Sequence, residues 1–530
     1  MTKIKDTVLV FLSSSLLILT FPKFDISSFA WMAFVPFFYV LINKGPVKAF
    51  FAGWTCGTLF FLGTIYWIIN TMINYGHISV AVSLMILLVF SVYLGLFFGL
   101  FAYIVSYIEI KLSLLAWVLA PFVWVCTELL RTHLFTGFPW VLLGYSQYRS
   151  LNLIQVADVT GVYGISFIIV AVNSCIFLIL SKMKFKKRSV GDFFSSDKIV
   201  ISYLILVVLM LICFFNYGKK QIEEFYYHSS TTEKTIKNKL VIAVIQGNIE
   251  QDKKWDRNYQ EETIKRYQKL TDKAIKGGNV DLVIWPETAT PFYLQSEGIY
   301  LDYLLNYLRE KKVYLLTGSP AYDNTQKYET ESFNSAFLLS PDFKILKRYD
   351  KIHLVPFGEF IPFERILKIN LFRDIIGDIG SFTSGREETV FSFSKGKFGT
   401  VICFEIIFPE LVRRFIKKGG EFMVTITNDA WFGKSAAPYQ HFAMTVFRAV
   451  ENKVYIARAA NTGISGFINP VGEIICSSGV FVEGYLRNDI YLMENKTIYT
   501  LYGDIFAWIC VLVLAASVIV VKMKKKDCFL

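Results

Sequence analysis

Several common catalytic signatures are absent from this chain of 530 residues. It contains no G-x-S-x-G, no H-E-x-x-H, no P-loop and no G-x-G-x-x-G, and its eight cysteines include no C-x-x-C pair. These absences remove the usual sequence indications of a serine hydrolase elbow, a zinc site or a nucleotide site. We therefore expect neither a metal nor another cofactor.

A concentrated basic face is also missing. The formal net charge of +12 would suggest nucleic acid only if the lysines were gathered together, but many of them stand in short loops between apolar spans. Lysines placed in this way indicate membrane topology. No nucleic-acid partner is expected.

Apolar sequence is abundant, with 54% of the residues hydrophobic. The excess lies in residues 1–217 and 503–521, whereas the middle of the chain has the mixed charge of a globular domain. Runs near the roughly 20 residues that cross a bilayer predict eight α-helical spans. The spans are predicted at 7–21, 26–43, 49–69, 79–105, 112–130, 162–181, 199–215 and 504–521.

This pattern predicts three parts: a membrane domain of seven helices (1–217), a soluble domain (218–502), and an eighth helix with a basic tail (503–530). Residues 7–21 also resemble a signal peptide, but the second span follows too closely for cleavage to leave it whole. The 79–108 run is too long for one untilted helix and too short for two, so it is expected to tilt or to project.

The lysines and arginines of the loops fall at alternate ends of the predicted spans. They precede the first span and follow the second, fourth, sixth and eighth, while residues 70–77 contain none. The positive-inside rule then places both termini in the cytoplasm and the soluble domain outside it. We therefore expect a multi-pass membrane protein.

The loop after the fifth span is rich in aromatic residues. It contains Gly137-Phe138-Pro139-Trp140 and Gly144-Tyr145-Ser146-Gln147. Tryptophan and tyrosine favour the membrane–water interface, so an aromatic belt is one explanation. The other is a segment that lines a lipid-facing cavity, with Trp140 and Tyr145 as substrate-binding candidates. The sequence leaves both open.

The soluble domain alternates strand and helix patterns. Strands are predicted at 240–246, 280–285, 313–318, 398–402 and 422–427, helices at 257–275, 299–310, 409–418 and 438–452, and hairpins within 332–349 and 454–469. Strands that are continuously apolar and alternate with helices favour a layered α/β domain around a buried sheet.

Three reactive side chains follow predicted strands: Glu287, Lys351 and Cys403. The carboxyl ends of strands in an α/β sheet converge on one crevice. There the acid can take a proton, the thiol can attack a carbonyl, and the amine can stabilise the oxyanion. Singly, each residue has an ordinary explanation as a helix cap, a surface charge or a small core residue.

The thiol itself leaves further questions. The helix that Pro409 allows to start is expected to favour the thiolate of Cys403. His353 and His441 keep a Cys–His arrangement open as a competing source of the base. Cys403 and Cys476 could form a disulfide if the domain lies outside the cytoplasm.

The short sequence motifs around these residues resemble those of a known family. Trp285-Pro286-Glu287, Lys351-x-His353-Leu354-Val355-Pro356-Phe357-Gly358-Glu359 and Cys403-Phe404-Glu405 occur in this order. They resemble the nitrilase superfamily of carbon–nitrogen hydrolases, and Asn428-Asp429-Ala430-Trp431-Phe432 and Arg458-Ala459-Ala460-Asn461-Thr462-Gly463 fit its later blocks. The resemblance implies a four-layer αββα sandwich in which Glu287 is the base, Lys351 stabilises the oxyanion and Cys403 is the nucleophile.

A nitrilase-like domain on a polytopic membrane domain resembles one branch, the apolipoprotein N-acyltransferases. This likeness implies transfer of an acyl chain from a membrane phospholipid, through a Cys403 thioester, to the α-amino group of a diacylglyceryl apolipoprotein. It also implies that Glu359 and Glu405 are supporting acids and that Trp255 belongs to a mobile loop. For location, it implies a monomeric enzyme of the bacterial cytoplasmic (inner) membrane with its catalytic domain on the periplasmic side. Where tyrosine is expected, the chain has Phe404, which keeps the ring and the backbone N–H but loses the hydroxyl.

Three further expectations follow. Cys403 must be free for this mechanism, so no bridge to Cys476 is expected. Residues 360–376 space their apolar side chains like a surface helix, either as an interfacial lid or as an ordinary packed helix. The rival functions are a membrane-tethered amidase with water as acceptor and an inactive scaffold in a receptor or transporter. Eight spans exceed what an anchor needs, and polar residues are scarce inside them.

Overall fold

The computed structural model describes residues 2–186, 198–231, 238–254, 257–296, 298–324, 330–342, 344–361 and 382–523. The chain divides into two compact units. Unit 1 comprises Met1–Ile69, Ser79–Ile222 and Tyr502–Leu530, and unit 2 comprises Asn70–Ile78 and Glu223–Leu501.

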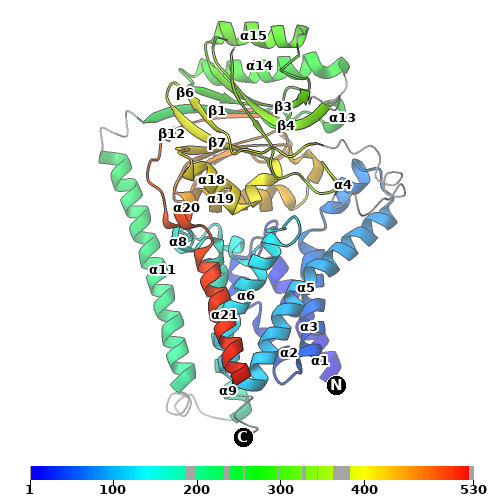
Figure 1. The fold of residues 1–530 in the computed structure, drawn as a ribbon, viewed down its shortest axis with the longest axis vertical. Coiled ribbons are helices and arrows are strands. Elements are labelled where there is room, and N and C mark those ends of the chain that lie inside the picture. The colour runs from blue at the N-terminus through cyan, green and yellow to red at the C-terminus, as the bar shows by residue number, and fades with distance from the viewer. Residues whose placement is uncertain are drawn as a thin grey trace. The chain divides into compact units, whose positions relative to one another are not determined.

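Unit 1 is helical (Figure 1). Its elements are α1 (Thr2–Leu19), η1 (Ser27–Trp31), α2 (Val35–Leu41), α3 (Pro46–Thr64), the start of α4 (Ile68–Asn74), α5 (Val80–Leu112), α6 (Leu115–His133), η2 (Leu143–Gln147), α7 (Leu151–Ile154), α8 (Ala157–Thr160), α9 (Val162–Lys186), most of α11 (Lys198–Thr231), and α21 (Ile505–Met523).

Several of these helices are long and apolar enough to cross a membrane. By length and composition, the described residues contain four such helices, within α5, α6, α9 and α11, or five if α3 and α4, bent by 55°, form one span. Residues 80–108 of the long predicted run lie in one continuous helix, α5, which has 33 residues. That this helix tilts or projects stays a prediction. The total of eight spans stays a prediction.

The second predicted span, residues 26–43, differs from the expectation. It is divided into the 3₁₀ turn η1 and the seven-residue helix α2. Pro36 lies in the first turn of α2, where a residue without an N–H is tolerated. A helix of this length measures about 10 Å, whereas the hydrocarbon core is about 30 Å thick, so α2 by itself cannot cross it.

Unit 2 contains two six-stranded sheets. The first has the order β12-β1-β2-β3-β4-β5, formed by β1 (Lys239–Gln246), β2 (Leu282–Ile284), β3 (Tyr314–Asn324), β4 (Thr330–Leu339), β5 (Ile345–Asp350) and β12 (Gly484–Tyr491). The second has the order β11-β10-β9-β8-β7-β6, formed by β6 (Val390–Phe393), β7 (Gly396–Ile402), β8 (Phe422–Thr427), β9 (Ile456–Ala460), β10 (Gly466–Ile468) and β11 (Ile474–Ser477).

Each sheet has three parallel strands flanked by antiparallel ones. In the first sheet the parallel strands are β1, β2 and β3, and in the second they are β7, β8 and β9. Parallel strands end at the same edge of a sheet, so the segments that follow β2, β7 and β8 are brought to common edges. The side chains at these strand ends form the site described below.

Helices cover the outer faces of both sheets (Figure 1). The helical segments of unit 2 are α13 (Gln251–Lys254), η3 (Arg257–Tyr259), α14 (Gln260–Lys276), α15 (Ile299–Lys311), η4 (Cys403–Ile407), α18 (Pro409–Lys417), η5 (Asp429–Phe432), α19 (Ala437–Asn452) and α20 (Ile498–Tyr502). The helices α14 and α15 cover the first sheet, and α18 and α19 lie against the second. The predicted αββα sandwich is confirmed.

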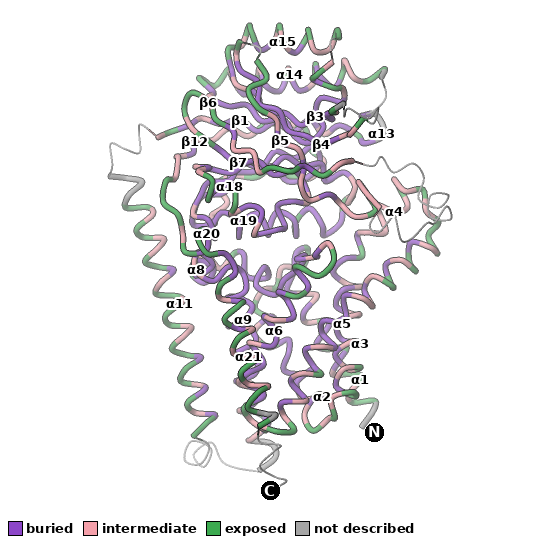
Figure 2. The backbone as a smooth tube through the Cα atoms, viewed as in Figure 1, coloured by how far each residue is buried: buried purple, intermediate pink, exposed green. Residues whose placement is uncertain are grey.

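The core of unit 2 follows from the apolar strands. All three residues of β2 and all six residues of β8 are buried, while α15 buries only Leu304 and Leu308 fully. Figure 2 shows this contrast between the buried strands and the partly exposed outer helix. Side chains at the ends of these strands are thus held by a rigid framework.

A short segment from early in the chain belongs to unit 2. Residues 70–78, in a loop of the predicted membrane domain, pack on the turn η5. Asn70 Nδ2 and Thr71 Oγ1 donate to the carbonyl oxygen of Trp431, at 2.9 and 3.0 Å. The Tyr75 ring meets the Trp431 ring edge-on, with centroids 4.9 Å apart. Unit 2 is therefore assembled from two separate stretches of sequence.

Candidate active site

Glu287 follows β2 in a turn that is fixed by its neighbours. Trp285 is fully buried, stacks on Tyr267 at 5.1 Å, and donates from Nε1 to Thr271 Oγ1. On β3, Gly318 lets this turn pack closely, because a Cβ there would lie 2.7 Å from Glu287 Cα. The Glu287 carboxylate is itself buried and accepts from the backbone N–H of Asn428 at 2.9 Å.

Lys351 follows β5 and is 1% exposed. Its Nζ donates to Glu359 Oε1 at 2.9 Å and lies 3.9 Å from Glu287 Oε1. Burial alone would lower the pKa of Lys351, but the two carboxylates outweigh it and raise this pKa above its usual value. The ammonium group therefore stays charged throughout the physiological range.

Asn334, inside β4, connects the two acids. Its Nδ2 donates to Glu287 Oε1 at 2.8 Å and to Glu359 Oε1 at 2.9 Å, and its backbone carbonyl accepts from the N–H of Lys351. We did not predict Asn334. An asparagine inside a strand carries no local sequence signal, since its partners lie 47 and 25 residues away.

Cys403 is the first residue after β7. It is buried, and its backbone has φ of 53°, a left-handed conformation that is uncommon for a side chain with a Cβ. The charges of Glu287 and Lys351 both act on its thiol, so the structure brings the three predicted side chains together.

The expected thiolate is not favoured. Burial raises the pKa of the Cys403 thiol well above its usual range, Glu287 adds to this rise, and Lys351 opposes it. The sequence-based expectation is wrong for two reasons. The thiol is removed from water, and the helix α18 begins only at Pro409, after the five-residue 3₁₀ turn η4. A buried thiol of this kind needs a base to remove its proton.

Glu405 holds the backbone around the thiol. It is fully buried, and its Oε1 accepts from the N–H groups of Ile352 and His353 and from the Tyr349 hydroxyl. Its Oε2 accepts from the N–H of Ile402 at 2.7 Å. Glu405 thus connects the segment after β5 to the end of β7.

Glu405→Gln is expected to change the pH dependence of stability. Burial raises the pKa of Glu405 to about 7, against its four donors and Lys351. A carboxyl whose pKa is raised in the folded state contributes stability at low pH that is lost as the pH rises from about 4.5 to about 7. The variant should lack this decline. It should also unfold about 1–3 kcal/mol more easily, because one N–H loses its acceptor.

The measurement is thermal unfolding of the wild type and Glu405→Gln, followed by tryptophan fluorescence from about pH 4.5 to about pH 8, a range that includes the Glu405 titration. Glu388→Gln is the matched control, since Glu388 pairs with Arg414 and Lys418 in a partly exposed position. Equal pH slopes in the wild type and Glu405→Gln would contradict the assignment.

Phe404 and His353 lie beside the thiol segment. The Phe404 ring is half-buried and contacts the Phe408 ring, with centroids 5.3 Å apart. The His353 ring stacks on the same Phe408 ring at 3.6 Å. His441, the other histidine considered as a base, has both ring nitrogens engaged: Nε2 lies 3.1 Å from the Cys403 carbonyl oxygen and Nδ1 lies 3.1 Å from Asp429 Oδ1.

Lys254 is a second buried lysine that sequence analysis missed. It ends α13, is 1% exposed, and donates from Nζ to the backbone carbonyl of Glu287 at 2.7 Å. Burial lowers the pKa of Lys254 to about 8, while Glu287 and Cys403 oppose that shift. The polar sequence around Lys254 does not predict that its side chain is buried.

Trp255 and residues 362–376 of the proposed lid fall outside the described residues. Trp140 and Tyr145 belong to unit 1, where both are at most 2% exposed, and this burial does not fit an aromatic belt facing lipid head groups. Cys403 and Cys476 are both free thiols in this structure.

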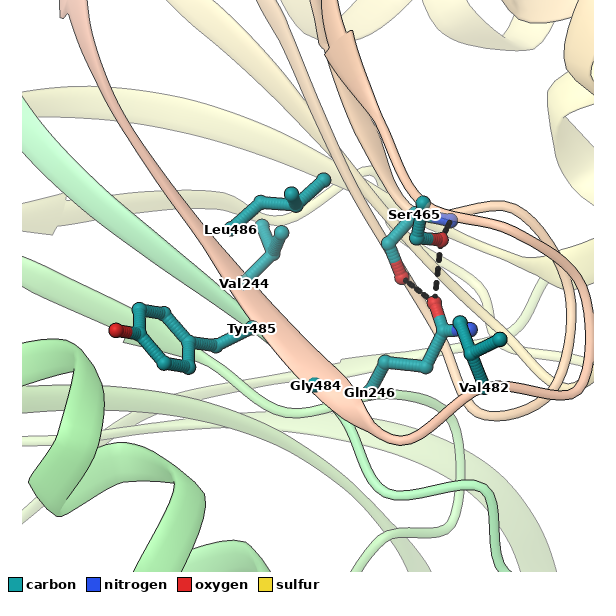
Figure 3. Close-up of a pocket in the computed structure, with 8 residues that line it drawn as sticks. Val244, Gln246, Ser465, Val482, Gly484, Tyr485 and Leu486 are labelled. Carbon is teal, nitrogen blue, oxygen red and sulfur yellow. Dashed lines mark hydrogen bonds between the residues drawn. The ribbon is translucent and has the colours of Figure 1, made fainter.

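No metal site is found in the described part of the chain, where His, Cys, Asp and Glu nowhere gather in a group that could hold an ion. A pocket next to β1 and β12 is lined in part by Gln246, Ser465 and Ser478 (Figure 3). Gln246 Oε1 accepts from both serine hydroxyls, and its Nε2 donates to the Gly479 carbonyl. These polar atoms satisfy one another, and the pocket contains none of the predicted site residues.

The cluster at the strand ends contains the groups that covalent acyl transfer needs. Glu287 is an acid next to a thiol that requires a base, and Lys351 adds a fixed positive charge. The N–H of Phe404 lies at the start of a helical turn, where backbone donors have no partner within the turn. Such donors are suited to an oxyanion.

Comparison with known proteins identifies relatives along nearly the whole chain. A model for the apolipoprotein N-acyltransferase N-terminal domain matches residues 13–175, and a carbon-nitrogen hydrolase model matches residues 241–495. The apolipoprotein N-acyltransferase of Geobacter metallireducens is 41% identical over 508 residues, which cover 96% of this chain and 93% of that protein.

More distant relatives carry the same name. The protein of Pasteurella multocida is 31% identical over 498 residues, which cover 92% of this chain and 90% of that protein.

Among solved structures, Nit3 of Saccharomyces cerevisiae, a member of the nitrilase superfamily, aligns with part of this chain. The alignment covers 48% of this chain and 90% of the Nit3 chain, at 20% identity and a TM-score of 0.38.

Proposed function

The chain belongs to the apolipoprotein N-acyltransferase family, and on this premise we propose how its residues carry out acyl transfer. As an enzyme of this family it acts on lipid and lipoprotein substrates in lipoprotein N-acylation. The proposal is that the acyl chain leaves a membrane phospholipid, is held as a thioester on Cys403, and passes to the α-amino group of a diacylglyceryl cysteine. The two half-reactions occur in turn at one site.

The first half-reaction forms the thioester. Glu287 takes the thiol proton, and Cys403 Sγ attacks the ester carbonyl of the phospholipid. The oxyanion is stabilised by the Lys351 ammonium and the N–H of Phe404. The tetrahedral adduct then breaks its C–O bond, and the lysophospholipid alkoxide leaves with the proton that Glu287 returns.

The second half-reaction uses the same groups in reverse. The neutral acceptor amine attacks the thioester carbonyl, and Glu287 removes a proton from the nitrogen as the C–N bond forms. The C–S bond breaks, the Cys403 thiolate leaves, and the proton returns to sulfur. Glu359 and Asn334 hold Lys351 and Glu287 in place during both steps.

The observation that carries the proposal is the buried group of three side chains from three strand ends. Glu287, Lys351 and Cys403 interact electrostatically although they lie far apart in the sequence. The raised pKa of the thiol explains why a carboxylate base is needed. Burial also keeps bulk water from a thioester, which favours transfer over hydrolysis.

For location, we propose the inner membrane with a periplasmic unit 2, cytoplasmic termini and a monomeric enzyme. The basic loops on alternate sides of the predicted spans support this orientation. Lys312 is exposed just after α15. A cysteine placed at Lys312 should react with a membrane-impermeant maleimide in spheroplasts, and labelling only after lysis would contradict the orientation.

The test of the mechanism is intact-protein mass spectrometry after incubation with phospholipid and no acceptor. We expect a mass increase of one fatty acyl group that hydroxylamine removes and that peptide mapping places on Cys403. A diacylglyceryl peptide added afterwards should remove the adduct and gain the same mass. Released fatty acid without an adduct would indicate an amidase-like hydrolase instead, and unchanged protein with intact lipid would contradict the thioester.

A further inference from the structure

Behind the thiol segment lies a second buried charged cluster that the mechanism above does not use. Asp429 (in η5), His441 (in α19) and Arg458 (in β9) are each at most 1% exposed. Arg458 Nη2 donates to Asp429 Oδ2 at 2.9 Å and lies 3.0 Å from His441 Nδ1. The cluster reaches the site through His441 Nε2, which is 3.1 Å from the Cys403 carbonyl oxygen.

The Cys403 carbonyl defines the state of Nε2. This carbonyl only accepts hydrogen bonds, so Nε2 carries a hydrogen. Nδ1 lies between a donor and an acceptor, 3.0 Å from Arg458 Nη2 and 3.1 Å from Asp429 Oδ1. Burial and Arg458 lower the pKa of His441, while Asp429 opposes them. The Thr427 hydroxyl donates to the Asp429 oxygen that faces Nδ1. His441 therefore donates from Nε2 to the Cys403 carbonyl.

The carbonyl that His441 holds belongs to the peptide bond between Cys403 and Phe404. This peptide unit is planar and trans, so its C=O and N–H groups point in opposite directions. Fixing the carbonyl toward His441 therefore aims the Phe404 N–H away from it. A hydrogen bond to the carbonyl also polarises the peptide and strengthens the N–H as a donor.

The backbone here needs such support. Cys403 has φ of 53°, and a non-glycine residue keeps this conformation only where its surroundings fix it. Glu405 holds the N–H of Ile402 before the thiol residue, and His441 holds the carbonyl of Cys403 itself. The turn is thus tied on both sides.

We propose that His441 is a positioning residue for acyl transfer: it holds the Cys403 carbonyl and so aims the Phe404 N–H at the oxyanion of the reacting acyl group. The proposal rests on the proposed thioester mechanism, in which that N–H is an oxyanion donor. His441 takes no proton from substrate or thiol. Its contribution is to the geometry of the transition state.

Two polar substitutions separate this role from packing. In His441→Gln the amide nitrogen can occupy the place of Nε2 and still donate to Cys403. In His441→Asn the shorter amide reaches only the place of Nδ1. Both keep a polar group in the cluster, so they form a matched pair. Met444→Leu, a buried change of similar volume on α19, controls for disturbance of the helix.

The measurement is the single-turnover rate of thioester formation at several phospholipid concentrations. His441→Asn should lower the maximal rate by about 10²–10³-fold, the usual effect of losing one oxyanion donor, without changing the half-saturating phospholipid concentration. His441→Gln should recover most of the rate and keep the wild-type pH profile, and Met444→Leu should resemble the wild type. Unfolding midpoints of all variants identify any that fail to fold.

The rates of the variants decide between a positioning role, a proton-transfer role and no role for His441. Equal rates for the Gln and Asn variants would overturn the positioning role, as would wild-type rates in both. A Gln variant as inactive as Asn, with an altered pH profile, would make His441 a proton carrier instead. If the wild type itself forms no thioester, the proposed mechanism fails. If the wild type forms the thioester and both His441 variants form it at the wild-type rate, the thioester mechanism stands and the positioning role of His441 is wrong.

Discussion

Cys403→Ala is expected to leave no detectable thioester and to lower acyl transfer by on the order of 10⁶-fold, the loss seen when a catalytic triad loses its nucleophile. The reason is that both half-reactions pass through one sulfur atom. No other group in the cluster can hold the acyl chain, because Glu287 and Lys351 are engaged with each other and with Asn334 and Glu359.

Acyl transfer from a fluorescent phospholipid to a diacylglyceryl peptide measures this loss, with the adduct followed by mass. Cys476→Ala is the matched control, since Cys476 is the second free thiol of unit 2 and lies in the edge strand β11. It should retain wild-type activity. A thioester that persists in Cys403→Ala and disappears in Cys476→Ala would show that Cys476, and not Cys403, is the nucleophile.

Glu287→Gln is expected to lower the rate of thioester formation at neutral pH by about 10²–10⁴-fold, the range attributed to general bases. The amide cannot accept the thiol proton. Its NH₂ group would also face a donor, either Asn334 Nδ2 or the N–H of Asn428, where the carboxylate now accepts from both. Part of the loss would therefore reflect a disturbed site.

The pH dependence of the rate of thioester formation distinguishes the loss of the base from the disturbance of the site. The negative charge of Glu287 raises the pKa of Cys403, so its removal should lower this pKa. Glu287→Gln should then recover activity as the pH rises and the thiolate forms without help, a gain that a merely misshapen site would not show. Glu388→Gln, which alters only a partly exposed ion pair, is the control. An unchanged rate and profile in Glu287→Gln would contradict its role as the base.

Sequence reasoning succeeded where one local pattern determined the outcome. The strands that precede Glu287 and Cys403 are unbroken apolar runs, and parallel strands of this kind deliver their following residues to one edge of a sheet. The strands β6, β11 and β12 were missed. They lie at or next to sheet edges and mix exposed with partly buried positions, which weakens their pattern.

The supporting groups could not be found in this way. Asn334 and Lys254 were not singled out, and His441 was considered only as a base. All three act through partners that lie 47, 33 and 38 residues away, and only folding creates those contacts. The expectation of a thiolate was wrong because the sign of a pKa shift depends on burial and on which charges surround the group. Neither can be read from the residues next to Cys403.

Hydropathy had a similar limit in the membrane domain. It located the long helices α5, α9 and α11 because each is a sustained apolar run. It did not detect the interruption between η1 and α2, where the chain stays apolar although its backbone turns. Average hydropathy reports composition, whereas a break in a helix depends on the conformation of a few residues.

The docking of residues 70–78 on η5 has a consequence for biosynthesis. Those residues leave the ribosome well before η5, and translation of the roughly 350 residues between them, at about 5–20 residues per second, takes on the order of tens of seconds. The first piece of unit 2 must therefore wait for its partner while several helices are inserted into the membrane. A chain that starts at residue 223 would never receive this piece. The carbonyl of Trp431 would then lack the donors that Asn70 and Thr71 supply.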